Sequence, residues 1–230
     1  MVEKSKVIIE LFGVLDVTGE VIGMWIILGI IALISLVIKF TLKEKPGKFQ
    51  NIIETGIEYL DNFFTDTLGK KKCRKYFTFL ASLFIFIIFS NYSGLVPGVG
   101  LTDYVKAPTS SLSVTAGLGI VTFIFLQAAG LRHSVKHYFK RFVSPMFIML
   151  PLLLLDEIIK PASLALRLYG NIFGEETVTE ELYHILPIGA PAIMMILSLL
   201  FCALQAIVFT MLVSIYLDEV TEEESILKEK

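Results

Sequence analysis

Long apolar stretches alternate with short charged segments along the whole chain. Three of them, Val21–Ile38, Tyr76–Val96 and Ala107–Leu131, contain no charged residue and are long enough for a helix to cross a bilayer. Ser144–Glu176 has no turn-forming cluster and Ile185–Leu217 has no charge; each has 33 residues, about 50 Å as a helix, against about 30 Å of hydrocarbon. We therefore predict an all-α polytopic membrane protein with five membrane helices. The last two should form a long hairpin that is steeply tilted in the bilayer.

Residues 48–69 have a different pattern, in which apolar side chains recur every three or four positions and acidic side chains occupy the opposite face. This spacing is typical of an amphipathic helix. Because both flanks are basic, we expect the helix to lie along the cytoplasmic membrane surface, with packing against another cytoplasmic element as the alternative. The apolar positions are Phe49, Ile52, Ile53, Ile57, Leu60, Phe63, Phe64 and Leu68.

The basic residues predict the orientation of the chain. They gather after the first apolar stretch, at residues 70–75 and at residues 132–141, and clusters of this kind mark cytoplasmic loops. The segment 1–20 and the loop that contains Asp103 should then lie outside, whereas Lys140 and the acidic C-terminal tail should be cytoplasmic. No internal repeat or linker divides the chain, so residues 1–230 are expected to form one membrane domain.

Composition narrows the possible functions. Hydrophobic residues make up 55% of the 230 residues, and the mean hydropathy is +0.74, which excludes an ordinary soluble domain. The net charge of −2 gives no reason to expect a nucleic-acid partner. The first 20 residues are too charged for a cleavable signal, and the two cysteines show no metal-ligand spacing. No phosphate loop or nucleophile motif is present, so we expect no metal, no cofactor and no catalytic site in this chain.

One arginine stands out in the last third of the chain. Placing an arginine at mid-bilayer costs roughly 2.5–3.5 kcal/mol, so Arg167 is expected to face an ion path and not lipid. Helical periodicity puts it on one face, here named the Arg167 stripe, with Lys160, Ser163, Asn171 and Gly174. A salt bridge from Arg167 to a neighbouring helix, made for stability alone, is the alternative.

Two short motifs carry a family resemblance. Residues 163–171 read Ser-Leu-Ala-Leu-Arg-Leu-Tyr-Gly-Asn and residues 204–209 read Leu-Gln-Ala-Ile-Val-Phe. The chain resembles subunit a of the F-type rotary ATP synthase, in order and spacing over roughly residues 75–220. The resemblance implies a non-catalytic stator subunit that passes H⁺ or Na⁺ to and from the carboxylates of a rotating c-ring through two offset half-channels. It also implies a multi-pass protein of a bacterial cell membrane, with the c-ring, the peripheral-stalk subunit b, the rest of the complex and membrane lipids as partners.

The resemblance assigns roles to individual residues. Arg167 matches the essential arginine of the family, and Asn171, one turn away, would contact the passing carboxylate or the guanidinium. Gln205 matches a glutamine of the partner helix that would orient Arg167. On the outer side the implied half-channel residues are Glu176, which aligns with the channel acid, and Asn91, Glu175, Glu180 and Ser198. Some relatives carry a histidine where Ser198 stands, and many carry an acid where Ser111 stands.

The inner half-channel is less clearly marked. Ser163 is expected to line it, whereas Asp156, Glu157 and Lys160 could line it too, or Asp156 and Lys160 could form an intrahelical pair. The roles of Glu181 and His184, near the outer mouth, stay open, as does the solvated alternative for Glu180. The nature of the coupling ion is open as well. A self-contained secondary transporter is the rival function, but the chain is short and lacks paired repeats. An intramembrane hydrolase lacks its motifs.

Overall fold

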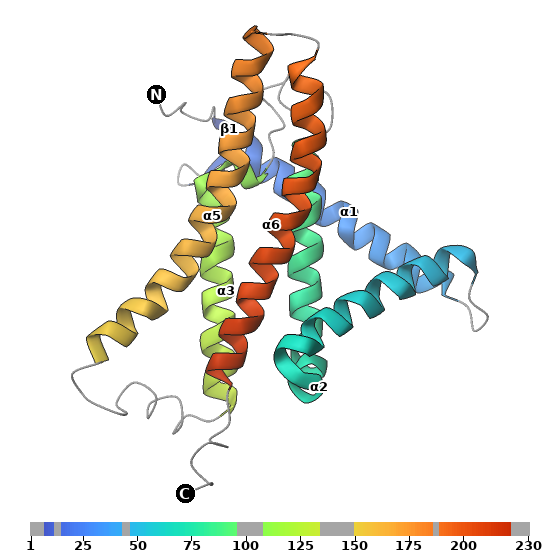
Figure 1. The fold of residues 1–230 in the computed structure, drawn as a ribbon, viewed down its shortest axis with the longest axis vertical. Coiled ribbons are helices and arrows are strands. Elements are labelled where there is room, and N and C mark those ends of the chain that lie inside the picture. The colour runs from blue at the N-terminus through green and yellow to red at the C-terminus, as the bar shows by residue number, and fades with distance from the viewer. Residues whose placement is uncertain are drawn as a thin grey trace, which may run out of the picture.

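The structure is a computed structural model. Five long helices make up most of the residues that it describes. The helices are α1 (Gly19–Thr41), α2 (Lys48–Ser93), α3 (Leu112–His133), α5 (Leu150–Ile185) and α6 (Ala190–Val220) (Figure 1). The described residues are 7–11, 15–42, 47–95, 108–133, 150–185 and 189–221. Within them, the predicted all-α membrane fold is confirmed.

Two short elements lie outside this helical pattern. The strands β1 (Val7–Leu11) and β2 (Leu15–Thr18) pair in an antiparallel hairpin directly before α1, and η1 (Pro108–Ser110) is a single 3₁₀ turn before α3. The hairpin lies in the segment predicted to be external, where we expected no strands. Several predictions fall outside the described residues, namely those for the loops that hold Asp103 and Lys140 and for the acidic tail.

α2 joins two predicted elements into one. The predicted surface helix over residues 48–69 and most of the predicted crossing over 76–96 both belong to α2, and non-helical φ and ψ angles divide α2 into two helices at Gly69, where the predicted surface helix ends. The basic residues between them are helical. The direction changes at Gly69, whose φ of 73° and ψ of 154° lie in a region that only glycine adopts readily. Before this bend Phe49 and Ile52 are exposed, and around it Phe64 and Leu68 are buried.

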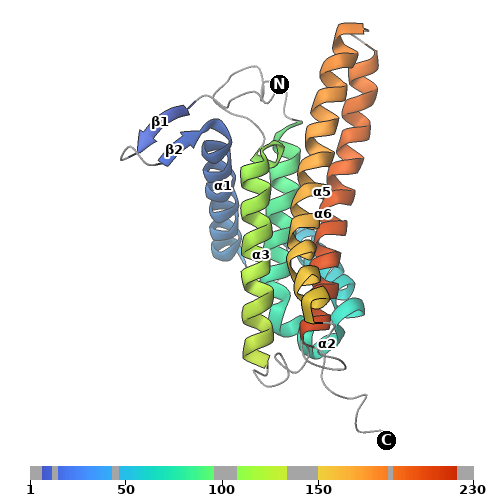
Figure 2. The ribbon, with the colours of Figure 1, turned by 90° about the vertical axis from the view of Figure 1, so that its left-hand side faces the viewer.

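The core lies between the second half of α2 and the last helix. On α2 the buried side chains recur at spacings of three and four residues, as do those on α6, which is the pattern of two helices packed along their length. The set consists of Tyr76, Leu80, Leu83 and Ile87 on α2 and of Ala206, Phe209, Val213 and Leu217 on α6. α6 thereby lies between α2 and α5, while α1 stands at the edge of the bundle (Figures 1 and 2).

A close helix crossing fixes α3 against α5. A Cβ atom at Gly119 would lie 3.0 Å from the carbonyl oxygen of Pro161 and 3.2 Å from the Cβ of Ala165, so glycine permits this approach. α5 continues through Pro161 without an interruption of its helical assignment. Pro151 is the second residue of α5, where a missing N–H costs little, so a proline there need not kink the helix.

The two last helices differ in their boundaries from the prediction. α5 begins at Leu150 and extends to Ile185, nine residues beyond the expected end at Glu176, and α6 runs from Ala190 to Val220. They lie side by side and antiparallel, as a hairpin requires (Figure 2). Among the described residues α1, α2, α3 and α6 are long and apolar enough to cross a membrane. α5 carries too many charges to meet that criterion, so its crossing and the tilt of the hairpin remain predictions.

Candidate functional site

The side chains of interest lie along the contact between α5 and α6. Asn171 Nδ2 of α5 donates a hydrogen bond of 2.5 Å to Gln205 Oε1 of α6. Gln205 is buried, and its Nε2 has no hydrogen-bond partner among the described residues. The predicted contact between these helices is therefore present, but the Gln205 carbonyl accepts from Asn171 and does not contact Arg167.

Arg167 is exposed on the surface of α5. No carboxylate of the described residues forms an ion pair with it, so the alternative of a purely stabilising salt bridge has no support there. The hydroxyl of Tyr216 on α6 lies within its electrostatic reach. The guanidinium thus lies on the surface of α5, and no carboxylate of the described residues forms an ion pair with it.

The surroundings of Arg167 leave room for another molecule. Ser163, Gly170 and Asn171 are exposed on the same face, and a Cβ atom added at Gly170 or Gly174 would meet nothing within 4 Å. Small residues on a helix face allow a second helix to approach closely. α6 covers this face only in part, through its contacts with Asn171 and Lys160.

Glu175 and Glu176 point in different directions. Glu175 is half-buried beside the Ser198 hydroxyl and within electrostatic reach of Cys202, both on α6. One of its carboxylate oxygens, Oε1, is buried with no hydrogen-bond partner among the described residues. Glu176 is exposed. Of the two predicted channel acids, the structure therefore brings Glu175, and not Glu176, to Ser198.

The end of α2 reaches the same level of α6. Asn91 Nδ2 donates to the carbonyl oxygen of Cys202 at 3.3 Å, and the Tyr92 hydroxyl donates to that of Leu199 at 3.3 Å. Asn91 is buried, and its Oδ1 has no partner among the described residues. Asn91 and Glu175 therefore meet the same turn of α6, whereas we did not predict the involvement of Tyr92 or Cys202.

A second group of polar contacts joins the first part of α5 to the end of α6 and to α3. Lys160 Nζ donates to both carboxylate oxygens of Glu219, at 2.6 and 2.8 Å, so the proposed intrahelical pair with Asp156 is wrong. Gln127 Nε2 of α3 donates to Glu157 Oε1 at 2.7 Å.

The contact partners on α6 share a helical spacing that the sequence contains. They form two groups with spacings of three and four residues, separated by eleven residues or about three helical turns, and this signal identifies the partners once α5 and α6 are known to be antiparallel. They are Ser198, Cys202, Gln205, Tyr216 and Glu219. Of the remaining predicted residues, Glu181 is exposed, and the side chains of Glu180 and His184 lie outside the described part of the structure.

The comparison with known proteins decides the family. The family model described as ATP synthase A chain matches residues 21–218. The chain belongs to this family. It is 36% identical over 203 residues to ATP synthase subunit a 1 of Syntrophotalea carbinolica, covering 86% of this chain and 84% of the relative. It is 33% identical over 209 residues to ATP synthase subunit a of Trichlorobacter lovleyi, covering 89% and 88% of the two chains.

A relative from a plastid is similar to the same degree. The chain is 33% identical over 213 residues to the chloroplastic ATP synthase subunit a of Stigeoclonium helveticum, covering 90% of this chain and 87% of the relative. As a member of the ATP synthase A chain family, the protein is a non-catalytic, ion-transporting subunit in the membrane sector of the complex. The rest of the ATP synthase is accordingly its partner, and the membrane is its location.

Proposed function

We propose that this subunit forms two offset half-channels that deliver a cation to, and remove it from, the carboxylates of a rotating ring. The observation that carries the proposal is Arg167, an exposed cation of α5 with no carboxylate partner among the described residues. An uncompensated arginine in a membrane helix is costly unless it meets an anion or water. A passing ring carboxylate supplies that anion.

The chemistry at Arg167 follows from electrostatics. A fixed cation close to a carboxylate favours its ionised form and disfavours the neutral, ion-loaded form. Each ring carboxylate that reaches Arg167 must therefore release its ion before it passes. The same charge repels a cation that crosses from one half-channel to the other directly, so ion flow requires rotation. The Asn171 amide nitrogen donates to Gln205, which leaves the Asn171 carbonyl oxygen for a contact near Arg167.

The face around Arg167 fits a packed helical ring. Gly170 and Gly174 leave the backbone accessible, and Leu166 and Phe173 are 59% and 49% exposed beside them. α6 adds an exposed apolar row at helical spacing, consisting of Leu204, Val208, Met211 and Ile215. Exposed apolar surface of this extent marks a contact with lipid or with another subunit.

The outer half-channel would start at the turn where α2, α5 and α6 meet. Buried polar atoms without partners are rare in proteins and point to water or an ion that they bind. Asn91 Oδ1 and Glu175 Oε1 are two such atoms, and both belong to residues that meet the Ser198–Cys202 turn. Glu176 and Glu180 would attract cations at the mouth.

The inner half-channel would open below Arg167, where Ser163 is exposed. We infer a bacterial cell membrane with the N-terminus outside and the C-terminus in the cytoplasm, and subunit b as a further contact. Either H⁺ or Na⁺ can follow a path lined by hydroxyl and carboxylate oxygens, so selection would reside in the ring.

Photocrosslinking tests the ring-facing surface. A photoreactive phenylalanine at Leu166 should crosslink to the ring subunit in membranes that contain the whole ATP synthase. The matched control is the same substitution at Ile124 of α3, because its exposed fraction of 60% is close to the 59% of Leu166. No crosslink from Leu166 to the ring subunit, or an equally strong one from Ile124, would contradict the proposal.

A further inference from the structure

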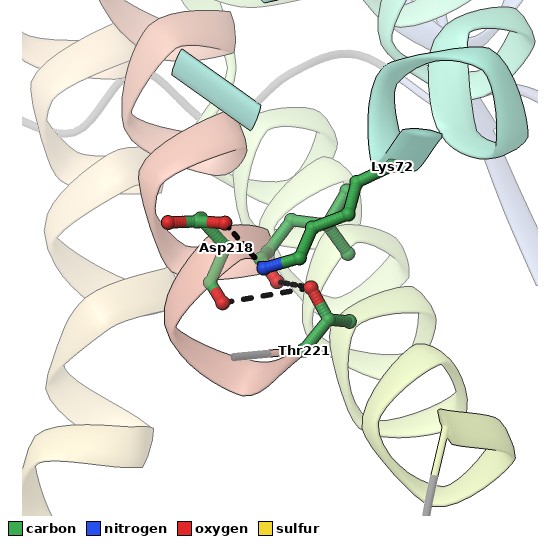
Figure 3. Close-up of polar contacts among 4 residues, drawn as sticks. Lys72, Asp218 and Thr221 are labelled. Carbon is green, nitrogen blue, oxygen red and sulfur yellow. Dashed lines mark hydrogen bonds and ion pairs between the residues drawn. The ribbon is translucent and has the colours of Figure 1, made fainter. Parts of the chain in front are cut away.

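Two ion pairs hold the last turn of α6, one on each side. Asp218 Oδ1 accepts from Lys72 Nζ of α2 at 2.6 Å, as Figure 3 shows, and the next residue, Glu219, accepts from Lys160 Nζ of α5 through both oxygens. The two pairs are alike in length and exposure: the acids are 40% and 42% exposed and the lysines 26% and 20%. They differ in where the lysine lies.

Lys160 belongs to the Arg167 stripe, whereas Lys72 lies on α2, on the far side of α6. Lys160 precedes Arg167 by seven residues, which is about 10 Å along a helix and close to two full turns. Its Nζ also lies 5.2 Å from the centroid of the Tyr216 ring. Tyr216 in turn is within electrostatic reach of both Arg167 and Glu219. A second cation therefore shares the α5–α6 contact with Arg167, and Glu219 compensates its charge.

The need for compensation follows from the proposed function, on which this inference rests. A ring carboxylate on the surface of α5 responds to every fixed cation along its path. An unpaired charge about 10 Å away, at an effective dielectric constant of about 20, alters an ionisation equilibrium roughly tenfold. An unpaired Lys160 would hold the carboxylate ionised at a second point and would repel the released cation on the inner side.

We propose that Glu219 is a positioning residue of the ion path, which holds the Lys160 ammonium against α6 and cancels its charge. Arg167 then acts as the uncompensated cation of the stripe, and the inner side below it stays open to the ion. The bidentate contact and the Tyr216 ring keep the ammonium in place. The Lys72–Asp218 pair has only a structural role.

A double substitution distinguishes this role from a purely structural one, in which the Lys160–Glu219 pair only holds α5 against α6. We call this structural alternative a clasp. In inverted membrane vesicles with the whole ATP synthase, Glu219→Gln should lower ATP-driven ion uptake and ATP synthesis per assembled complex roughly tenfold. The double variant Lys160→Gln with Glu219→Gln should restore both rates close to those of the parent chain, because no unpaired ammonium remains. A clasp predicts that the double variant is at least as slow as the single one.

Asp218→Asn is the matched control, since it removes the neighbouring ion pair and should leave both rates per complex unchanged. Parent rates in Glu219→Gln, no recovery in the double variant, or failure of both to assemble would each overturn the inference. Arg167→Ala separates the two levels of the account. If Arg167→Ala still couples ion flow to ATP, the proposed function fails; if it does not, a silent Glu219→Gln refutes only the role of Glu219.

Discussion

Arg167 is the central residue of the proposed ion path. Helix geometry, more than distance along the sequence, determines the partners of the residues around it. Asn171 and Lys160 share its stripe, yet each finds its partner on α6, 34 and 59 residues away. Motif resemblance identified Asn171 and Gln205, because their side chains are part of recognisable runs. It gave no partner for Lys160, since a nearby acid at helical spacing, Asp156, offered a local solution that the structure does not adopt.

The first prediction at this scale distinguishes two adjacent acids. Glu175→Gln should slow ion entry from the outer side by at least about tenfold, because the half-buried carboxylate beside Ser198 attracts cations within a confined path. Glu176→Gln should have a smaller effect, since its side chain is exposed. The measurement is the initial rate of ion-driven ATP synthesis against outer ion concentration. A larger loss in Glu176→Gln would contradict this placement.

At the scale of elements, hydrophobic periodicity predicted the helices well and their junctions poorly. The predicted apolar stretches overlap largely with α1, α2, α3 and α6, because burial in lipid leaves little freedom in where charges are placed. The sequence predicted a surface helix that ends at residue 69 and a crossing that begins at residue 76, with five basic residues between them. In the structure the two helices meet at Gly69, which has a positive φ, and the basic residues belong to the second helix.

Gly69→Ala should therefore destabilise α2 at its bend. Alanine at φ 73° and ψ 154° costs about 1–3 kcal/mol, and the loss is conformational because no atom lies within 4 Å of the added Cβ. Thermal unfolding in detergent should show a lower midpoint. The control is Gly56→Ala in the same helix, where the space is equally open and alanine raises helix propensity by about 0.8–1.0 kcal/mol. Equal midpoints for both variants would refute the role of Gly69.

The N-terminal hairpin shows a second limit of periodicity. Residues 7–18 are too short and too charged to cross a membrane, and we predicted only an external segment there. The strands need each other to satisfy their backbone groups, and a pairing of this kind leaves no strong signal in a stretch of twelve residues. α5 shows the opposite case, in which a helix continues through Pro161 and past Glu176 because its polar positions find partners on α3 and α6.

At the scale of the whole molecule, the packing of the bundle supports the α5–α6 hairpin. α6 lies between α2 and α5 and fixes the α5–α6 hairpin to the rest of the bundle, while Arg167 stays exposed on α5. A subunit that withstands the torque of a ring needs a rigid support behind the contact surface. The core contacts of α2 with α6 supply that support.

Cysteine labelling tests the predicted topology. Cysteines placed at Asp103 and at Lys140, both outside the described residues, should react with a membrane-impermeant maleimide from opposite sides, because the positive-inside rule predicts that the basic loop is cytoplasmic. The native Cys73 and Cys202 are buried, so they give little background. Reaction of both sites in intact cells would refute the orientation.

The central claim is that the charge of Arg167 forces ions to travel with the ring. The most direct measurement is ATP-driven ion uptake and ATP synthesis in membrane vesicles from cells that carry Arg167→Ala, normalised to assembled complex. We predict that assembly is retained, because Arg167 is exposed and forms no ion pair within the described chain, and that both activities are lost. Arg167→Lys should also fail, since a lysine ammonium lacks the planar guanidinium fork. Coupling at the rate of the parent chain in either variant would contradict the account.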